Sequence, residues 1–442
     1  MRRVFIFLLV ILSVFQLNAV TLSFGNTSVD PVAEHPGASS GLEGVYVFRS
    51  LDGVSCTVGG IPAGAAVRWE LFDNRGASFA TAVAPGLISG GAGTSTITEL
   101  TSDRGYRVYI NDSPVISFWV IDYSAHPCTV RSIEPAAEQV CGTATLSVDG
   151  EAPRLSYCTI TGRSYELSRD IRLEYRTQQP DPQAIRFITT DTVVSLPYVQ
   201  STINIGAPLC DTQFHLSADR FLRAWGEEMQ LTSSMLTAST VDAMVTASQK
   251  SHDSDNEIGA DDSSVELLGG SAPAEITFEA AVTDAAIYHE WLLAKDPEFY
   301  DVILRTSDME FTHIFTDMGT YYAKFTADNA MGSCAYESEV YTVSIGESSL
   351  LCPNAFSPAG SEGVNDMWKV SYKSIVEFEC YIFNSWGVKL AEFHDPSQGW
   401  DGRYRGKVVN PGVYYYVIKA RGSDGRQYNL SGDINIIGYN KK

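Results

Sequence analysis

Histidine and cysteine are the side chains best suited to hold a metal ion or act as a nucleophile, and their spacing in this chain argues against both roles. The seven histidines are scattered at positions 35, 126, 215, 252, 289, 313 and 394. His289-Glu290-Trp291 lacks the second histidine that a zinc protease places one helical turn later. No Cys-x-x-Cys pair occurs, and the Gly-x-Ser-x-Gly run at residues 37–41 follows a proline and lacks the strand-to-helix setting of a nucleophile elbow, so zinc-finger, thioredoxin-like and serine-hydrolase chemistry are not indicated. We expect no catalytic residue, no bound metal and no cofactor.

Acidic side chains suggest a second kind of chemistry. Asp253, Asp255 and Glu257 alternate along the chain, as the oxygen ligands of a calcium ion must if they are to face one centre. The calcium-loop template also requires Gly at its sixth position and Glu at its twelfth, where this chain has Ile and Ser. Low hydrophobicity and like charges predict instead an acidic, solvated linker or long loop over residues 251–271.

Glycoside hydrolysis stays open as an alternative, because its two carboxyl groups need only meet in space. The chain has 53 Asp and Glu residues, so chance pairs are numerous. Small β modules seldom form a deep pocket, and we keep a hydrolase as the third of three functional classes. The formal net charge of −22 argues against nucleic acid as a partner, since binding it requires clustered Lys and Arg.

The first 19 residues have the layout of a secretory signal peptide. Arg2 and Arg3 precede an apolar run from Val4 to Phe15, and the sequence then reaches Ala19 as a small residue for cleavage. The apolar run has about 12 residues, whereas a membrane span needs about 20. We predict cleavage after Ala19 and a secreted mature protein with no transmembrane span.

Export would allow the eight cysteines to form disulfides. Cys352 precedes the first strand of the expected last domain, and Cys380 lies in one of its later strands. We predict that these two cysteines pair. The alternative is that Cys380 is a small buried apolar residue.

Strand-like runs recur along the whole chain. They are short and rich in β-branched and aromatic residues, and Gly, Pro, Asn and Asp separate them. With 442 residues the chain is too long for a single sandwich core. We predict an all-β protein of tandem immunoglobulin-like β-sandwich domains. The expected segments are a signal peptide at 1–19, a sandwich at 20–127, one or two sandwiches at 128–250, the acidic linker at 251–271, a sandwich at 272–347 and a last domain at 348–442.

One local spacing occurs twice, in Asp317-x-Gly319-x-Tyr321 and in Asn410-x-Gly412-x-Tyr414. An Asp or Asn side chain can cap such a turn, while Gly adopts a backbone angle that other residues avoid. The tyrosine hydroxyl then donates a hydrogen bond to upstream backbone, as in a tyrosine corner. Two such corners predict two separate sandwiches.

The segment 272–347 has a strand on which Tyr321, Ala323, Phe325 and Ala327 share one face. A Gly turn precedes this strand and an Asn-Ala-Met-Gly turn follows it. The pattern resembles PKD-type immunoglobulin-like domains, although the family's Trp-Asp-Phe-Gly-Asp-Gly run is absent.

The last segment carries several separated motifs: Cys352-Pro353-Asn354-Ala355-Phe356-Ser357-Pro358, Gly363-Val364-Asn365-Asp366, Tyr381-Ile382-Phe383-Asn384-Ser385-Trp386-Gly387, Gly399-Trp400-Asp401-Gly402, Pro411-Gly412-Val413-Tyr414 and Gly432-Asp433-Ile434-Asn435-Ile436. In this order they resemble the gliding-motility-associated C-terminal domain, which is the type B sorting domain carried by substrates of the type IX secretion system of Bacteroidetes. Two positions depart from the family: Ser385 replaces an Arg, and Ser361-Glu362-Gly363 replaces an Asp-Gly turn.

The resemblance implies that the type IX secretion machinery reads this domain. The protein would then be held at the cell surface, often through an outer-membrane β-barrel anchor, or released outside. The implied sorting or docking residues are Pro353, Asn354, Phe356, Pro358, Asn365, Asp366, Phe383, Asn384, Trp386, Gly387, Gly399, Trp400, Asp401, Gly402, Gly412, Tyr414 and Gly432. The alternative is that these residues only hold turns.

Taken together, these features predict a non-enzymatic, exported cell-surface protein whose function is attachment and display. The rival class is a secreted adhesin whose upstream sandwiches bind a glycan or a host protein.

Overall fold

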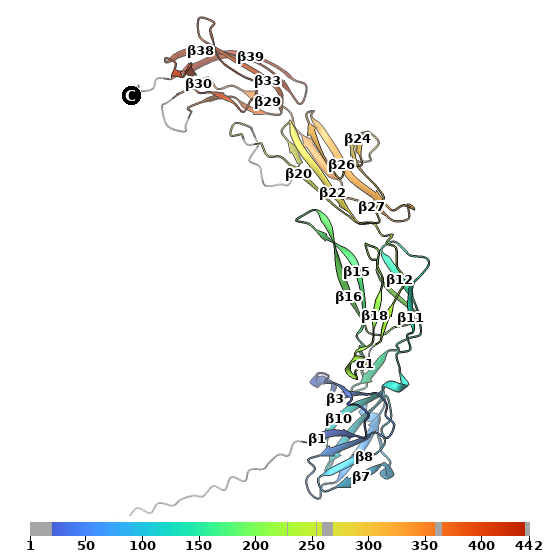
Figure 1. The fold of residues 1–442 in the computed structure, drawn as a ribbon. Helices are drawn as coiled ribbons and strands as arrows, with labels where there is room; N and C mark the ends of the chain where they lie inside the picture. The colour runs from blue at the N-terminus through green and yellow to red at the C-terminus, as the bar shows by residue number, and fades with distance from the viewer. Residues whose placement is uncertain (1–19, 228, 253, 259–267, 359–364, 438–442) are drawn as a thin grey trace, which may run out of the picture. The chain divides into compact units, whose positions relative to one another are not determined.

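The computed structural model describes residues 20–437, except 228, 253, 259–267 and 359–364 (Figure 1). The predicted signal peptide lies outside the described residues. One short helix, α1 (Arg220–Ala224), and a few 3-10 turns interrupt a succession of β-strands, so the predicted all-β class is confirmed. The chain forms two compact units: residues 20–176, 191–206 and 211–236 make the first, and 177–190, 207–210 and 237–437 make the second. No helix in the described part of the chain has the length and apolarity that crossing a membrane requires.

The first module is a sandwich of two sheets. One sheet has the strand order β1 (Thr21–Gly25), β4 (Ser55–Gly59), β8 (Thr94–Ile97) and β7 (Ile88–Gly91). The other has the order β2 (Val32–Glu34), β3 (Gly44–Phe48), β10 (Ser113–Asp122), β9 (Arg104–Ile110), β5 (Val67–Phe72) and β6 (Thr81–Ala82). Between the sheets lies a core in which the rings of Trp69 and Phe118 meet edge to face at 6.5 Å. Edge-to-face pairs of this kind add to the stabilisation from burial alone.

The second module contains three sheets. The first joins β11 (Ser132–Pro135), β12 (Thr143–Asp149) and β17 (Thr202–Gly206), and the second joins β13 (Leu155–Cys158) and β14 (Ser164–Leu167). The third has the order β16 (Arg186–Leu196), β15 (Ile171–Asp181), β18 (His215–Ser217) and β19 (Gln230–Thr232). Asp219 caps α1, because its Oδ1 accepts a hydrogen bond from the backbone N–H of Leu222 at 2.9 Å.

Within the first unit, the two modules share a hydrophobic core. Val45 and Val47 of β3 and Trp119 of β10 pack in one cluster with Leu155 of β13 and Phe221 of α1. All five side chains are buried. Burial of this kind stabilises by about 1.5–3 kcal/mol for each large apolar side chain, so the two modules behave as one packed body.

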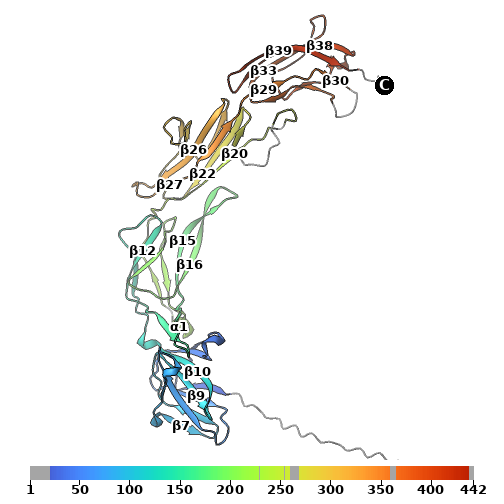
Figure 2. The same ribbon diagram turned by 180° about the vertical axis from the view of Figure 1, so that it is seen from behind.

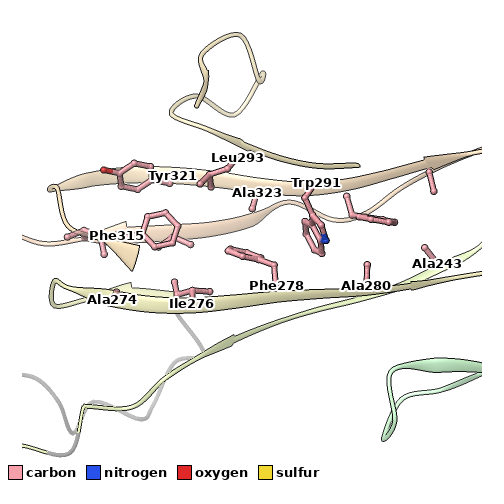
Figure 3. Close-up of a cluster of buried hydrophobic side chains, with 14 of the residues drawn as sticks. Ala243, Ala274, Ile276, Phe278, Ala280, Trp291, Leu293, Phe315, Tyr321 and Ala323 are labelled. Carbon is pink, nitrogen blue, oxygen red and sulfur yellow. The ribbon is translucent and has the colours of Figure 1, made fainter. Parts of the chain in front are cut away.

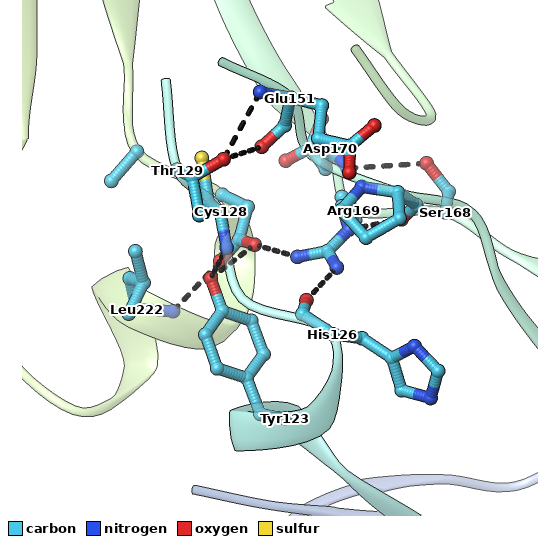
Figure 4. A network of polar contacts seen from close by, with 12 residues as sticks. Tyr123, His126, Cys128, Thr129, Glu151, Ser168, Arg169, Asp170 and Leu222 are labelled. Carbon is cyan, nitrogen blue, oxygen red and sulfur yellow. Dashed lines mark hydrogen bonds and ion pairs between the residues drawn. The ribbon is translucent and has the colours of Figure 1, made fainter. Parts of the chain in front are cut away.

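A buried ion pair of the second module lies at the same junction, and its hydrogen bonds reach Tyr123 and His126 of the first module (Figure 4). The guanidinium of Arg169 donates to Asp219 at 2.6 Å, and both side chains are completely buried. Arg169 also donates to the backbone oxygens of Pro153, at 2.6 Å, and His126. The hydroxyl of Tyr123, from the first module, donates to the same carboxylate at 2.9 Å. The charges are thus paired and hydrogen-bonded, as buried charges must be.

The third module is a sandwich in the second unit. One sheet has the order β20 (Ala243–Gln249), β22 (Ala274–Val282) and β25 (Glu310–Phe315). The other has the order β21 (Leu268–Gly270), β28 (Tyr341–Ile345), β26 (Gly319–Asp328), β23 (Tyr288–Ala294) and β24 (Val302–Thr306), with β27 (Ala335–Glu337) paired to β26. Figure 3 shows Trp291, Phe278 and Tyr321 filling the space between the sheets. Because β20 pairs with β22 along its whole length, the module begins before the boundary expected at residue 251.

The last module is built around one five-stranded sheet, with the order β30 (Ala355–Phe356), β39 (Gln427–Ile436), β38 (Gly412–Gly422), β33 (Ile375–Phe383) and β34 (Lys389–Phe393). Figure 2 shows these strands from behind. Three two-stranded sheets complete the module: β29 (Ser349–Leu351) with β32 (Ser371–Lys373), β31 (Trp368–Lys369) with β35 (Gly399–Trp400), and β36 (Arg403–Tyr404) with β37 (Lys407–Val408). Trp368, Phe378, Trp400 and Ile434 lie in its core.

Both predicted tyrosine corners are confirmed. The hydroxyl of Tyr321 donates to the backbone oxygen of Asp317 at 3.0 Å, and that of Tyr414 donates to the backbone oxygen of Asn410 at 2.8 Å. The two corners lie in the third and the last module, as the repeated spacing predicts.

Candidate functional site

Three of the predicted docking residues meet in the core of the last module. The ring of Trp400 lies 5.5 Å from that of Phe356 and 5.3 Å from that of Tyr414. Phe356 and Trp400 are buried, and the indole N–H of Trp400 donates to the backbone oxygen of Arg403 at 3.0 Å. These side chains therefore support the sheet from inside, and no partner can reach most of their surface.

Two glycines of the motifs occur where a side chain would collide. Gly402 has a φ of +71°, and a Cβ there would lie 2.7 Å from Pro358. At Gly432 a Cβ would lie 2.7 Å from the hydroxyl of Tyr416. At both positions the lack of a side chain is required by the packing of the domain itself, so the glycines are explained without any contact to a partner.

The polar motif residues hold turns. The side-chain oxygen of Asn384 accepts from the backbone N–H groups of Trp386 and Val388, at 3.0 and 2.9 Å. The Asp401 carboxylate accepts from the backbone N–H of Arg403 at 2.9 Å. Both are short side chains that replace a backbone acceptor inside a turn.

The remaining predicted residues contribute mainly through the backbone. The Pro353 oxygen accepts from the indole of Trp368 at 2.6 Å, and the Asn354 oxygen accepts from the backbone N–H of Asn435 at 2.8 Å. The Asn365 oxygen accepts from Ser357 at 2.9 Å. The other positions are strand ends or loop residues: Asp366, Phe383, Gly387, Gly399 and Gly412.

Trp386 is the exception. Its side chain is 89% exposed at the tip of the turn between β33 and β34, and the two hydrogen bonds to Asn384 hold that turn. Unlike the rings of Phe356 and Trp400, the indole of Trp386 is therefore open to a partner.

An apolar strip on the outer face of the five-stranded sheet begins beside this turn. Val413, Tyr415 and Val417 of β38 are exposed, and Tyr415 pairs with Phe383 while Val417 pairs with Tyr381. Tyr414 and Tyr416 point to the opposite face, as strand alternation predicts. We call Trp386 and these five residues the outer strip. Alternation could have located its β38 residues from the sequence, but the β33 partners required the register.

The predicted Cys352–Cys380 disulfide is wrong for this structure, in which both residues are thiols. Cys380 is completely buried in the core, and burial raises its pKa to about 12. Burial also raises the pKa of Cys352, whose thiol interacts with Tyr416.

The acidic segment is not simply a solvated linker. The Asn256 amide donates to the backbone oxygens of Val370, at 2.6 Å, and Pro396, at 2.8 Å. Glu257 forms an isolated parallel bridge with Tyr372 of β32. Residues 254–258 thus lie along the last module, a contact that composition cannot reveal because it is made largely by backbone atoms.

Its described carboxylates have cationic partners. Asp255 pairs with Lys369 at 2.6 Å, and the nearly buried Glu257 pairs with the imidazole of His252 at 2.9 Å. Asp253 lies outside the described residues. No group of three or more potential metal-ligating side chains occurs among the residues that the structure describes.

Comparison with known families agrees with this geometry. Residues 350–436 match the CHU_C type IX secretion signal domain, and residues 133–233 match a fibronectin type III domain. The chain ends in a type IX sorting domain. An immunoglobulin-like domain of the fibronectin type precedes it in the second module, which the sequence patterns did not name. The sorting domain marks the protein for export to the cell surface or beyond.

Solved structures with tandem domains are similar to this chain at low identity. The tetra-tandem repeat of a large adhesion protein is 13% identical, with 89% of this chain and 98% of that chain covered and a TM-score of 0.20. The eight N-terminal Ig domains of the Down Syndrome Cell Adhesion Molecule are 11% identical, with 92% and 55% covered and a TM-score of 0.26. Chicken CNTN1 FN1-FN3 is 11% identical, with 70% and 98% covered and a TM-score of 0.23. No curated protein matches the chain.

Proposed function

We propose that this protein is a non-enzymatic attachment and display protein, which the type IX secretion machinery delivers across the outer membrane. The signal peptide at 1–19 directs the first export step, and the last module directs the second. The chain is then held at the surface, through an outer-membrane β-barrel anchor, or released. The observation that supports this most directly is the sorting domain at residues 350–436.

Recognition by the machinery uses the outer strip. The other docking candidates pack in the core or hold turns, whereas Trp386 and Tyr415 present aromatic surface to solvent. Aromatic side chains are enriched at the energetic centres of protein interfaces. The turns that Asn384 and Asp401 hold then serve recognition indirectly, because they fix the strands that carry this strip.

Deletion of Leu351 to Lys442 in the native host tests the proposal, with fractionation and surface labelling as the readout. Accumulation of the shortened chain in the periplasm supports it, and unchanged surface exposure contradicts it. Deletion also removes the contacts of residues 254–258, so a folded variant is needed beside it.

The double variant Trp386→Ala, Tyr415→Ala removes the two exposed rings and leaves the core intact. We expect a loss of surface labelling of at least tenfold. The matched control is Tyr300→Ala, since Tyr300 is equally exposed at 89% but lies in the third module. If both variants reach the surface as the wild type does, the machinery reads another part of the last module.

A further inference from the structure

A hollow lies within the first compact unit, between the first and second modules. Its volume is about 310 Å³, which is within the range of roughly 300–1,000 Å³ typical of small-molecule sites. Glu34 of β2 lines it from the first module. From the second module, Tyr157, Glu166, Ser168, Asp170 and Arg220 line it.

Tyr157 is the aromatic residue that lines the hollow, and it stacks on a second tyrosine outside the lining. The ring of Tyr157 lies 5.6 Å from the ring of Tyr165, with an angle of 18° between their planes. Burial raises the pKa of Tyr157, so its hydroxyl stays neutral and can both donate and accept. A tyrosine held in this way presents an apolar body and a polar tip to the same ligand.

Each carboxylate in the hollow contacts an arginine. Glu34 pairs with Arg220. Glu166 pairs with Arg154 at 2.8 Å, and Asp170 pairs with Arg223 at 2.7 Å. Asp170 also pairs with Arg172 at 3.7 Å. Every carboxylate of the lining is therefore compensated by arginine, and none is left without a counterion to bind a cationic ligand.

The same pairs argue against hydrolysis. A glycosidase needs one carboxyl group that stays protonated, and apolar surroundings provide this. Here Asp170 accepts from the hydroxyl of Ser195 at 2.6 Å. That hydrogen bond, with the nearby arginines, lowers its pKa. The site has acceptors that can bind hydroxyl groups, and no carboxyl group in apolar surroundings to act as an acid.

Arg220 offers an unused donor. Its Nε is buried and has no hydrogen-bond partner among the described residues, while another nitrogen of the same guanidinium contacts Glu34. A buried N–H without an acceptor costs about 1–3 kcal/mol. Arg220 also lines the hollow, so its guanidinium can donate to an oxygen atom of a ligand there.

The hollow is also preformed. Its two sides belong to modules that share a hydrophobic core. Asp170 adjoins Arg169, which pairs with Asp219, and hydrogen bonds with Tyr123 and His126 connect this pair to the first module (Figure 4). A site that is already ordered loses little entropy when a ligand binds.

We propose that this hollow binds a neutral saccharide. The ring of Tyr157 packs against the apolar face of a sugar ring, the carboxylates accept from its hydroxyl groups, and Arg220 donates to a sugar oxygen. This inference concerns the upstream modules and does not depend on how the last module is read. It names neutral saccharides as the class of ligand that the displayed protein binds.

The test uses the purified mature chain on an array of neutral and acidic oligosaccharides, followed by calorimetric titration of the neutral oligosaccharide with the strongest signal. We expect Tyr157→Ala to weaken binding about tenfold or more, since stacking contributes of the order of 1 kcal/mol beyond buried area. Glu166→Gln, at an exposed position, keeps the side-chain volume and weakens binding at least threefold. Tyr300→Ala is the control and leaves binding unchanged.

Three outcomes overturn the proposal. The first is no binding of any neutral oligosaccharide by the wild type. The second is a preference for acidic oligosaccharides. The third is binding that survives both Tyr157→Ala and Glu166→Gln. Because Tyr157 also packs near the shared core, thermal unfolding of each variant is measured in parallel, and Glu166→Gln decides the result if Tyr157→Ala unfolds.

Discussion

Replacing Arg169 by Met should destabilise the first compact unit more than any surface substitution. The wild-type guanidinium satisfies Asp219 and the backbone oxygens of Pro153 and His126, and no part of either charged side chain reaches water. In Arg169→Met the carboxylate keeps two donors, the Tyr123 hydroxyl and the backbone N–H of Leu222. Its charge is then buried without a counterion.

The expected cost follows from that geometry. Removing one partner of a buried ion pair costs about 3–5 kcal/mol, because the other charge stays desolvated. For a folding unit of 150–250 residues, each kcal/mol lowers Tm by about 2–4 °C. The Tm of the first unit should therefore fall by roughly 6–20 °C.

Differential scanning calorimetry of the mature chain measures this shift. The control is Arg131→Met, which breaks a pair with Asp149 at 3.3 Å between exposed side chains and should cost less than about 1 kcal/mol. Adding Asp219→Asn to Arg169→Met removes the stranded charge, keeps the helix cap and should recover part of the loss. The reasoning is refuted if Arg169→Met behaves like the control, or if the two substitutions are strictly additive.

Three further predictions concern the second unit. Glu257 raises the pKa of His252, chiefly through their hydrogen bond. Although burial alone would raise the pKa of Glu257, its hydrogen bond to His252 helps bring that pKa below its usual value. The His252–Glu257 pair therefore stabilises the folded second unit at pH 5–6, below the unfolded pKa of histidine of about 6.5. This stabilisation is lost as pH rises through the folded pKa of His252. In denaturant titrations, the gap between wild type and His252→Gln should be largest near pH 5–6 and should close at alkaline pH; a gap independent of pH contradicts this. Tyr321→Phe should cost about 1 kcal/mol in the same assay, and no change would show that the corner hydrogen bond adds nothing. Alkylation under native and denaturing conditions, read by mass spectrometry of the peptides, should label Cys352 and Cys380 only after unfolding; if the peptides of both residues stay unlabelled without reductant, the two form a disulfide.

Period-2 patterns and turn residues were enough to predict the all-β class and both tyrosine corners. These features depend on neighbours within a few residues, such as Asp317 and Tyr321, so the sequence records them directly. The shared core of the first two modules depends instead on Val45, Leu155 and Phe221, which are far apart in the chain. No local pattern distinguishes such a core from that of a separate sandwich.

The candidate sites were predictable to different degrees for the same reason. The sorting motifs could be recognised because their glycines and turn residues are local requirements of one fold. Residues 254–258 were predicted from composition as solvated, yet Asn256 and Glu257 bind the last module through backbone partners, which composition does not encode. The saccharide hollow combines Glu34 with Tyr157 and Arg220, and only the packed junction brings these residues together.

The motif residues of the last module also indicate how a sorting signal can stay recognisable while its partner contact varies. Phe356 and Trp400 are buried, and Asn384 and Asp401 accept hydrogen bonds inside turns. What they determine is the position of strands β33 and β38, and so the position of Trp386 and the rest of the outer strip. Ser385 stands where the family has an Arg; this difference changes a neighbour of Trp386 and leaves the turn intact. Substitutions in the buried motif residues should therefore abolish folding and export together, whereas substitutions in the outer strip should impair export of a folded protein.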